Sequence, residues 1–476
     1  MCESLRKAAA RASRPAMATA AALMIVATLG GLRTARADLE EYVRKPDPAF
    51  AWSEVARGST ASGKFTELAL TSQVWKGITW KHSLCVYEPA QIAHDNACLL
   101  LITGGQNGRR PGADDHEMAF ILARACGARV AVLKQVPNQP LLDGKTEDTL
   151  IAETFVRYLQ TKDEEWPLLF PMVKSAVRAM DAVAAWTKQQ GRPAPRFVVS
   201  GASKRGWTTW LTGAMDNRVV GIAPMVIVML NLGPQGPNQL KVWGHYSEQI
   251  HDYVERGLME KVRTPHGSRL WQMVDPYTYR DRLAKPKFLI NGTNDRYWTL
   301  DALDLYWGGL KGPKHLVELP NAGHGLEQNR DWAVNGLGAF FRHAATGRTM
   351  PRLSWSFDTA KQGESVLKVQ AEPAPRTARL WTAHASTRDF REARWEPIQV
   401  ASPDAAKPAE IREQKPASRY IHDFTLDAST ITARVAPPDD GRLALFAEVE
   451  YEVDGLPYHL TTTFFEPGIT PHRESK

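Results

Sequence analysis

Cysteine is scarce in this sequence. Four cysteines occur among 476 residues, and no two are spaced as C-x-x-C, the pairing on which structural zinc sites are commonly built. The sequence therefore predicts no metal site, and no motif in it requires an organic cofactor. Cys2 lies in a segment that we predict to be removed, which leaves Cys85, Cys98 and Cys126. An oxidising compartment allows these three one disulfide and one free thiol, but the apolar runs around Cys85 and Cys98 suit buried thiols equally well.

Long apolar runs are absent beyond the first 37 residues, so no later stretch suits a membrane-spanning helix. Residues 1–37 begin with basic side chains, continue as AMATAAALMIVATLGGL and end on ARA. This order is typical of a secretory signal peptide cleaved before Asp38, and it predicts a secreted or periplasmic protein. A membrane anchor is the alternative, but the apolar stretch is short for that role and rich in Ala and Gly.

A large excess of one charge is also missing once residues 1–37 are set aside. The net charge is +7, and these residues hold six basic and one acidic side chain, a net +5, which leaves +2. This balance gives no reason to expect binding to nucleic acid or to an anionic membrane. The expected partner is a small-molecule, peptide or envelope-derived substrate, and the sequence leaves the oligomeric state open.

The chain is long enough for two or three domains, and its composition is that of a globular protein. From residue 38 to about residue 348, short apolar runs alternate with helical patterns. Such runs are typical of strands buried on both faces of a parallel sheet. We therefore predict an α/β fold with a mostly parallel sheet and helices on both faces. The predicted parallel strands are 97–105, 128–137, 196–201, 219–228, 285–295 and 314–320. Between the last two of these strands, TLDALDLYWGGL predicts a helix over residues 299–310.

Two stretches fall outside this alternation. Residues 231–285 are helical and aromatic, far longer than the ~10–15 residues of a plain crossover. We predict an insertion there that forms a lid or pocket wall, or else supplies additional packing helices. Residues 349–476 lack helical patterns and consist of short strands with Pro, Asp and Gly turns, which predicts an Ig-like C-terminal β-sandwich.

The stretch VVSGASKRGWTTW, residues 198–210, joins a buried strand to a helix. It is close to the G-x-S-x-G turn of a nucleophilic serine, but Arg205 stands at the place of the second glycine and Gly206 follows one residue late. A serine at such a junction exposes its Oγ, and the next backbone N–H lies at a helix N-terminus. Ser203 is therefore a candidate nucleophile. An ordinary helix N-cap is the alternative.

Two further residues lie where the partners of such a serine are expected, in the order Ser, Asp, His. Asp295 ends the segment 285–295, directly after its buried strand, and His324, flanked by glycines, follows the strand 314–320. Taken singly, each also suits a turn acid or a surface histidine. Together at successive strand ends they favour a catalytic triad, in which Asp295 orients His324 and His324 accepts the proton of Ser203.

Stabilisation of an oxyanion requires backbone donors close to the serine. We expect one donor to be the N–H of Lys204, and a second to come from the loop that carries Gly104 and Gly105. Gln106 in the same loop and Gln139 near a later strand exit are predicted to contact the substrate.

Lys204 and Arg205 place two cations at a helix start, which the helix dipole disfavours unless an anion lies nearby. We expect one of them to hold the oxyanion or an anionic group of the substrate, with Arg205 assigned to substrate binding.

The segments LLITGGQNG, VLKQVPNQPL, KTEDTLIAETFVRYL, VSGASKRGWTTWLTGAMDNRVVGIAPMV and PNAGHGL resemble the PhoPQ-activated pathogenicity-related protein family. The autocrine proliferation repressor proteins look like relatives of that family. The resemblance covers most of residues 38–347 and implies an α/β-hydrolase-like fold with a triad of Ser203, Asp295 and His324. It also marks QVPNQPL and Glu147–Asp148 as characteristic positions, although Glu147 is equally well explained as a helix-start charge. The G-x-S-[KR]-x-G arrangement is similar to glucuronoyl esterases, in which the basic residue after the serine aids the oxyanion.

The sequence thus predicts a serine hydrolase that cleaves an ester or amide through an acyl-enzyme, with carboxylesterase and peptidase both open. The alternative is a non-catalytic binding or signalling protein on the same scaffold, involved in envelope stress or virulence, with the C-terminal sandwich as its contact surface.

Overall fold

The computed structural model describes residues 38–359, 364–399 and 418–469. The predicted signal peptide, residues 1–37, lies outside the described residues, and secretion stays a prediction. Within the described ranges, no helix is both apolar enough and long enough to cross a membrane.

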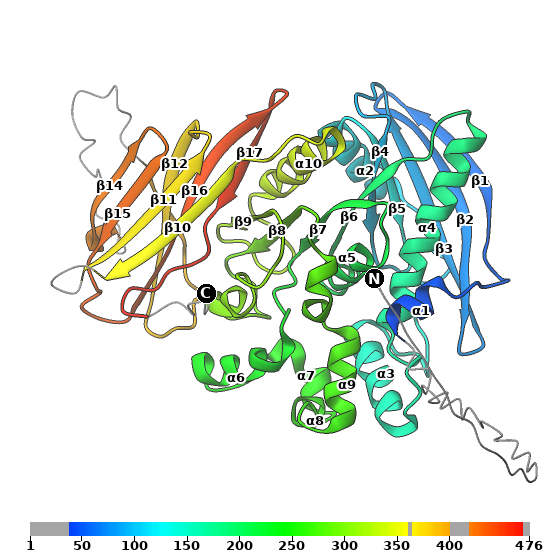
Figure 1. The fold of residues 1–476 in the computed structure, drawn as a ribbon, viewed down its shortest axis with the longest axis horizontal. Helices are drawn as coiled ribbons and strands as arrows, with labels where there is room; N and C mark the ends of the chain where they lie inside the picture. Colours follow the sequence, from blue (N-terminus) through cyan, green and yellow to red (C-terminus); the bar gives the residue numbers. More distant parts are fainter. Residues whose placement is uncertain (1–37, 360–363, 400–417, 470–476) are drawn as a thin grey trace, which may run out of the picture. The chain divides into compact units, whose positions relative to one another are not determined.

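A nine-stranded sheet organises the larger part of the chain, in the order β1-β2-β3-β5-β4-β6-β7-β8-β9 (Figure 1). Its strands are β1 (Ala51–Thr60), β2 (Gly63–Trp75), β3 (Ile78–Pro89), β4 (Ala97–Ile102), β5 (Arg129–Leu133), β6 (Arg196–Ala202), β7 (Val219–Met225), β8 (Lys287–Gly292) and β9 (Lys314–Leu319). The first three strands and the β3–β5 pair are antiparallel, and every pairing from β5 to β9 is parallel.

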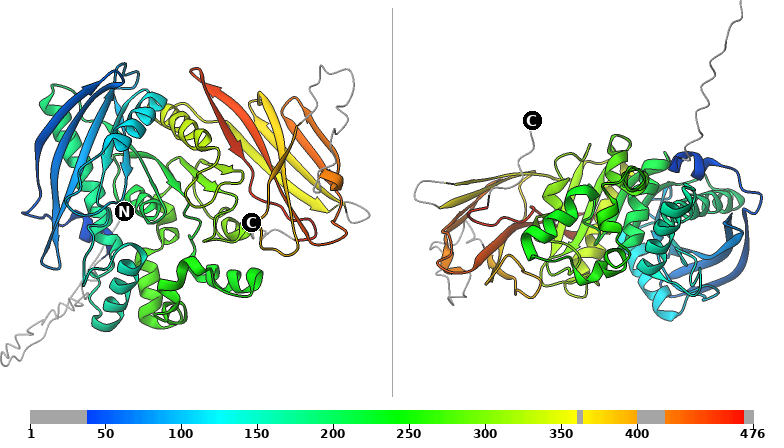
Figure 2. Two further views of the ribbon diagram at one scale, coloured as in Figure 1. Left: turned by 180° about the vertical axis from the view of Figure 1, so that it is seen from behind. Right: turned by 90° about the horizontal axis from the view of Figure 1, so that it is seen from below.

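The parallel strands are buried because helices cover both faces of the sheet. β5 and β8 are buried at every residue, as expected for uninterrupted apolar runs. The helices here are α1 (Leu39–Arg44), α2 (Ala113–Cys126), α3 (Glu147–Thr161), α4 (Leu169–Gln189), α5 (Lys204–Met215) and α10 (Arg330–Thr346). α2 and α10 pack together over one face, and α4 and α5 pack together over the other (Figures 1 and 2). The predicted fold class is confirmed.

The predicted insertion, residues 231–285, is helical. Its elements are α6 (Leu232–Trp243), η1 (Glu248–Ile250), α7 (His251–Val254), α8 (Leu258–Lys261), α9 (Pro265–Val274) and η2 (Pro276–Arg282). α7, α8 and α9 pack against α3, below the sheet as it is drawn in Figure 1. The predicted function of this insertion as a lid stays a prediction.

One predicted helix, residues 299–310, is wrong. The chain instead forms the short 3-10 helix η3 (Leu300–Leu305). Asn238 of α6 donates to Thr299 Oγ1 at 2.9 Å and to Asp301 Oδ1 at 2.7 Å, and these tertiary bonds fix the first turn. A segment this short has little intrinsic tendency to propagate an α-helix against such contacts.

The C-terminal strands form two four-stranded antiparallel sheets, β10-β11-β15-β14 and β13-β12-β16-β17, as the predicted sandwich requires. Their strands are β10 (Arg352–Thr359), β11 (Ser365–Glu372), β12 (Thr377–Ala385), β13 (Glu396–Gln399), β14 (Ile421–Asp427), β15 (Thr430–Val435), β16 (Arg442–Val453) and β17 (Leu456–Thr461). β17 packs against α10 and β9, where the rings of Trp332 and His459 stack at 4.0 Å. The boundary predicted at residues 348 and 349 stays a prediction.

Cys85, Cys98 and Cys126 are buried free thiols, so the structure supports the second of the two alternatives for them. Burial raises the pKa of Cys85 and of Cys98 to about 12.

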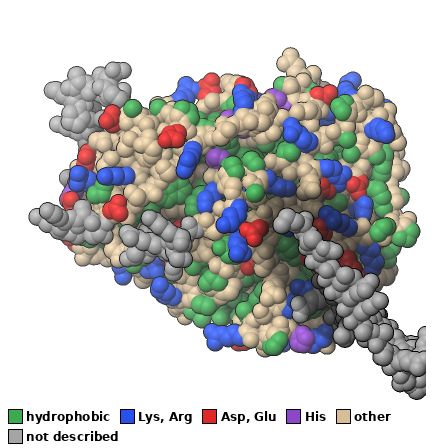
Figure 3. All heavy atoms as spheres, viewed as in Figure 1, with side chains coloured by type: hydrophobic (Ala, Val, Ile, Leu, Met, Phe, Trp, Pro, Cys, Tyr) green, Lys and Arg blue, Asp and Glu red, His purple; other side chains and the backbone are tan. Residues whose placement is uncertain are grey.

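On the face of the molecule in Figure 3, basic and acidic side chains are interspersed.

Candidate active site

Ser203 lies at the turn between β6 and α5, in a conformation that favours glycine. Its backbone angles are φ 57° and ψ −127°. A non-glycine residue in this region stores strain of about 1–3 kcal/mol, a cost found mainly at functional sites. Ser203 occupies the N-cap position, but its hydroxyl caps none of the described backbone N–H groups. Ordinary helix capping therefore does not explain this serine.

The late Gly206 has a packing function in the same turn. A Cβ atom at Gly206 would lie 2.9 Å from Met225 O and 3.0 Å from Gly201 O. A Cβ atom at Gly201 would lie 2.8 Å from Arg205 O. The first turn of α5 thus packs directly on the end of β6, and the G-x-S-x-x-G spacing provides that approach.

Asp295 and His324 are joined by a hydrogen bond. Asp295 lies just after β8 and is buried, and its Oδ2 accepts from His324 Nδ1 at 2.8 Å. Because Nδ1 carries the proton of this bond, Nε2 is left as the basic nitrogen. The Nε2 atom is buried and has no hydrogen-bond partner among the described residues. The ring of Tyr297 lies over His324 with centroids 4.2 Å apart, and Tyr297 N donates to Asp295 Oδ1 at 2.9 Å.

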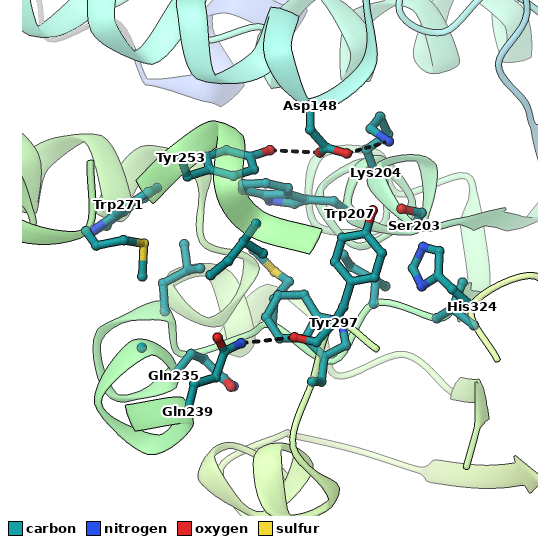
Figure 4. A pocket seen from close by; sticks show the side chains of 18 of the residues that line it. Asp148, Ser203, Lys204, Trp207, Gln235, Gln239, Tyr253, Trp271, Tyr297 and His324 are labelled. Atoms are coloured by element: carbon teal, nitrogen blue, oxygen red, sulfur yellow. Dashed lines mark hydrogen bonds and ion pairs between the residues drawn. The ribbon is translucent and has the colours of Figure 1, made fainter. Parts of the chain in front are cut away.

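Ser203 and His324 line the same end of one pocket (Figure 4). In the described part of the chain no hydrogen bond joins Ser203 Oγ to His324 Nε2, a contact that is often long without substrate. Asp295 is thus hydrogen-bonded to His324, and Ser203 lies in the same pocket as His324. Their catalytic roles stay predictions.

Lys204 and Arg205 bind an anion that the chain itself supplies. Lys204 Nζ lies 2.9 Å from Glu147 Oε2 and 3.1 Å from Asp148 Oδ2. Arg205 donates from both terminal nitrogens to the Glu147 carboxylate at 2.8 Å. Burial alone would raise the pKa of Glu147, but the hydrogen bonds and charge of Arg205 and the charge of Lys204 outweigh it and lower that pKa to about 2. The anion expected near the two cations is therefore the start of α3.

Gln139 belongs to the same cluster. Its side chain donates to Glu147 Oε1 at 2.5 Å and accepts from Glu147 N at 2.9 Å. Neither Gln139 nor Arg205 lines the pocket beside Ser203. Both side chains instead bind Glu147 at the start of α3. The substrate-binding roles predicted for them gain no support.

The loop predicted to bind the oxyanion is positioned by Arg205. A Cβ atom at Gly104 would lie 2.3 Å from Arg205 Nη2, so the guanidinium fills the space that a side chain would need. Gly104 O accepts from Gln135 N at 2.9 Å. Gly105 adopts φ 112°, and Gln106 is exposed. None of these three residues lines the pocket, so their roles stay predictions, as does that of the Lys204 N–H.

Tyr297 and Tyr253 also line the pocket and were not predicted from the sequence. Tyr297 carries the only local signal, an aromatic pair that directly follows the turn of Asp295. Among the described residues, no group of three or more His, Cys, Asp or Glu side chains is arranged as a metal site.

The parallel sheet, its flanking helices and the strained serine after a central strand define an α/β-hydrolase fold. Residues 39–391 match the model of the PhoPQ-activated pathogenicity-related protein family, and the chain belongs to this family. The match continues past residue 348 into the first strands of the sandwich.

Autocrine proliferation repressor protein A of Dictyostelium discoideum is 30% identical over an alignment of 456 residues, which covers 88% of this chain and 91% of that protein. Among solved structures, the chain is similar to acetyl xylan esterase 1 of Thermoanaerobacterium sp., with 16% identity and a TM-score of 0.45 over 63% of this chain and 93% of that chain. A glucuronoyl esterase of Solibacter usitatus gives 14% identity and a TM-score of 0.39 over 62% and 87% of the two chains.

Proposed function

We propose that this protein is a serine hydrolase that cleaves an ester or amide bond through an acyl-enzyme. The observation that carries the proposal is the strained backbone of Ser203 beside the Asp295–His324 pair. A residue held at φ 57° on a strand-to-helix turn, next to a histidine whose buried Nε2 has no partner among the described residues, has the geometry of an activated nucleophile.

The proposed steps assign one task to each side chain. His324 Nε2 takes the proton of Ser203 as Oγ bonds to the substrate carbonyl carbon, and Asp295 stabilises the imidazolium that forms. The backbone N–H of Lys204, at the N-terminus of α5, donates to the oxyanion, with a second donor expected in the Gly104–Gly105 loop. His324 then passes its proton to the leaving group, and a water molecule releases the acid by the same route.

The hydrolysis of p-nitrophenyl acetate by the purified protein tests this proposal. Ser203→Ala is expected to lower kcat by about a thousandfold or more, as removal of a triad nucleophile does. Ser268→Ala alters an exposed serine of α9 and serves as the control, with unchanged rates. Equal rates in Ser203→Ala and in the unaltered protein would contradict the proposal. A folded protein without any turnover would favour the non-catalytic alternative.

An ester and an amide of the same acid, compared in parallel, distinguish a carboxylesterase from a peptidase.

We also propose that the protein is exported, on the basis of residues 1–37. N-terminal sequencing of the protein from culture medium or periplasm tests this proposal, with Asp38 as the expected first residue.

A further inference from the structure

The pocket beside Ser203 extends toward the helices of the insertion (Figure 4). It encloses about 810 Å³ of space between atoms, including the part open to solvent. Much of its wall is carbon, supplied by Trp207, Ile227, Met229, Met259, Trp271 and Trp298. The indole nitrogens of Trp271 and Trp298 are themselves buried, so these side chains present hydrocarbon to a ligand.

The two glutamines in the wall are occupied by protein partners. Gln235 Nε2 donates to Leu230 O at 2.9 Å, and Gln239 Nε2 donates to Tyr297 O at 2.9 Å. Gln239 Oε1 accepts from Ser247 N at 2.9 Å. The Gln239 amide is thus bonded to the protein at both its oxygen and its nitrogen, and the Gln235 amide is bonded through its nitrogen.

The two charged side chains in the wall neutralise each other. Asp148 Oδ2 pairs with Lys204 Nζ at 3.1 Å, and Asp148 Oδ1 accepts from Tyr253 OH at 2.9 Å. Behind them, Glu147 and Arg205 form a second opposite pair. The cluster carries two cations and two anions, so a charged ligand would find no uncompensated partner in the described wall.

Apart from Gln235 Oε1 and the buried indole nitrogens of Trp271 and Trp298, the polar groups of the wall without a partner among the described residues lie at one end. Ser203 Oγ, His324 Nε2 and the Tyr297 hydroxyl make no hydrogen bond with other described residues, and Figure 4 shows all three residues together at the Ser203 end of the pocket. A ligand therefore meets hydrogen-bonding groups at the position of the scissile bond and hydrocarbon beyond it.

We propose that the substrates are uncharged esters or amides that place an apolar aliphatic or aromatic group in this pocket. This inference rests on the proposed hydrolase function and names its substrate class. A carboxylate or ammonium group in the pocket would lose its hydration without gaining a partner, which strongly disfavours binding. The structure thus points away from an anionic group held by Arg205.

Isosteric esters test the proposal directly. The p-nitrophenyl esters of acetic acid, hexanoic acid, adipic acid (with one free carboxylate) and 6-aminohexanoic acid vary length and charge separately. We expect kcat/KM for the hexanoate to exceed that for the acetate and for both charged esters by about tenfold or more. The hexyl, 5-carboxypentyl and 6-aminohexyl esters of acetic acid repeat the comparison on the alcohol side. Equal or faster cleavage of a charged ester in both series would overturn the inference.

A charge placed in the wall provides the matched variant. Met259 lines the pocket from α8, and Met259→Lys is expected to raise the adipate-to-hexanoate ratio of kcat/KM several-fold. Glu260→Gln changes the net charge by the same amount on the adjacent exposed residue and should leave the ratio unchanged. Equal ratios in the two variants would contradict the inference. Absence of any esterase activity would instead be failure of the proposed function.

Discussion

Arg205 and Glu147, 58 residues apart in sequence, form a bidentate ion pair in which both N–O distances are 2.8 Å. Arg205 Nε also donates to Val136 O at 2.6 Å, and its guanidinium packs against Gly104. One side chain therefore links the turn of Ser203 to the start of α3 and to the glycine loop. The position that holds glycine in G-x-S-x-G turns here holds the residue that joins these three segments.

Arg205→Lys should weaken this junction although it keeps the charge. The lysine ammonium cannot reproduce the two parallel hydrogen bonds that the planar guanidinium donates to the Glu147 carboxylate. We expect a loss of about 1–3 kcal/mol in unfolding free energy and a lower kcat, because a partly buried carboxylate loses hydrogen bonds. Thermal unfolding and ester hydrolysis measure both. Arg348→Lys, in the exposed pair with Asp454, is the control and should change stability by less than about 1 kcal/mol. Equal effects in both variants would contradict the assigned role.

Glu147 should contribute to acid lability. Its pKa in the folded state, about 2, is below the ordinary value of 4.5, so its stabilising effect is full above pH 4.5 and is lost as pH falls from 4.5 toward 2. Glu147→Gln should therefore be less stable than the unaltered protein at pH 7, and its melting temperature should fall less between pH 6 and pH 3. If the melting temperatures of the two proteins fell by the same amount between pH 6 and pH 3, the proposed contribution of Glu147 to acid lability would be contradicted.

Gly206→Ala should disturb the turn of Ser203. The added methyl would meet Ile227 Cγ2 at 2.7 Å and the backbone of Met225 at 2.9 Å. Overpacking of this kind costs about 1–3 kcal/mol, and we expect esterase activity to fall with stability. Gly233→Ala in α6 is the matched control, since no described atom outside the glycine's own helix turn lies within 4 Å of its Cβ position. Unchanged stability and activity in Gly206→Ala would show that the spacing has no packing function.

Tyr297 should act as a positioning residue for His324. Tyr297→Leu removes the ring that lies 4.2 Å from the imidazole. We expect kcat for the acetate ester to fall by about tenfold or less, in line with the energy of an aromatic pair, with little change in KM. Tyr297→Phe keeps the ring and should stay within about twofold. A large loss in Tyr297→Phe would instead assign the hydroxyl a direct role in binding.

Local sequence signals were sufficient for much of the fold and for the positions of Ser203, Asp295 and His324. Ser203 directly follows a strand of the parallel part of the sheet, Asp295 and His324 lie in the turns after two later strands, and parallel strands end at one edge of the sheet. The requirement for an anion near Lys204 and Arg205 also came from local physics, through the helix dipole.

Long-range contacts account for what the sequence could not provide. The identity of that anion depends on how α3 packs against α5, which no local pattern encodes. The helix predicted over residues 299–310 failed because Asn238, about 60 residues earlier, binds its first turn. The apolar pocket likewise combines residues from the loop after β7, from α6 to α9 and from the turn of Tyr297, whose proximity follows only from the tertiary fold.

The central claim is that Ser203 is a nucleophile, and covalent labelling with a fluorophosphonate probe tests it most directly. We expect one probe molecule per chain by intact mass, located on the peptide that contains Ser203, and none in Ser203→Ala or after heat denaturation. A folded protein that stays unlabelled, or a label on another serine that persists in Ser203→Ala, would contradict the account.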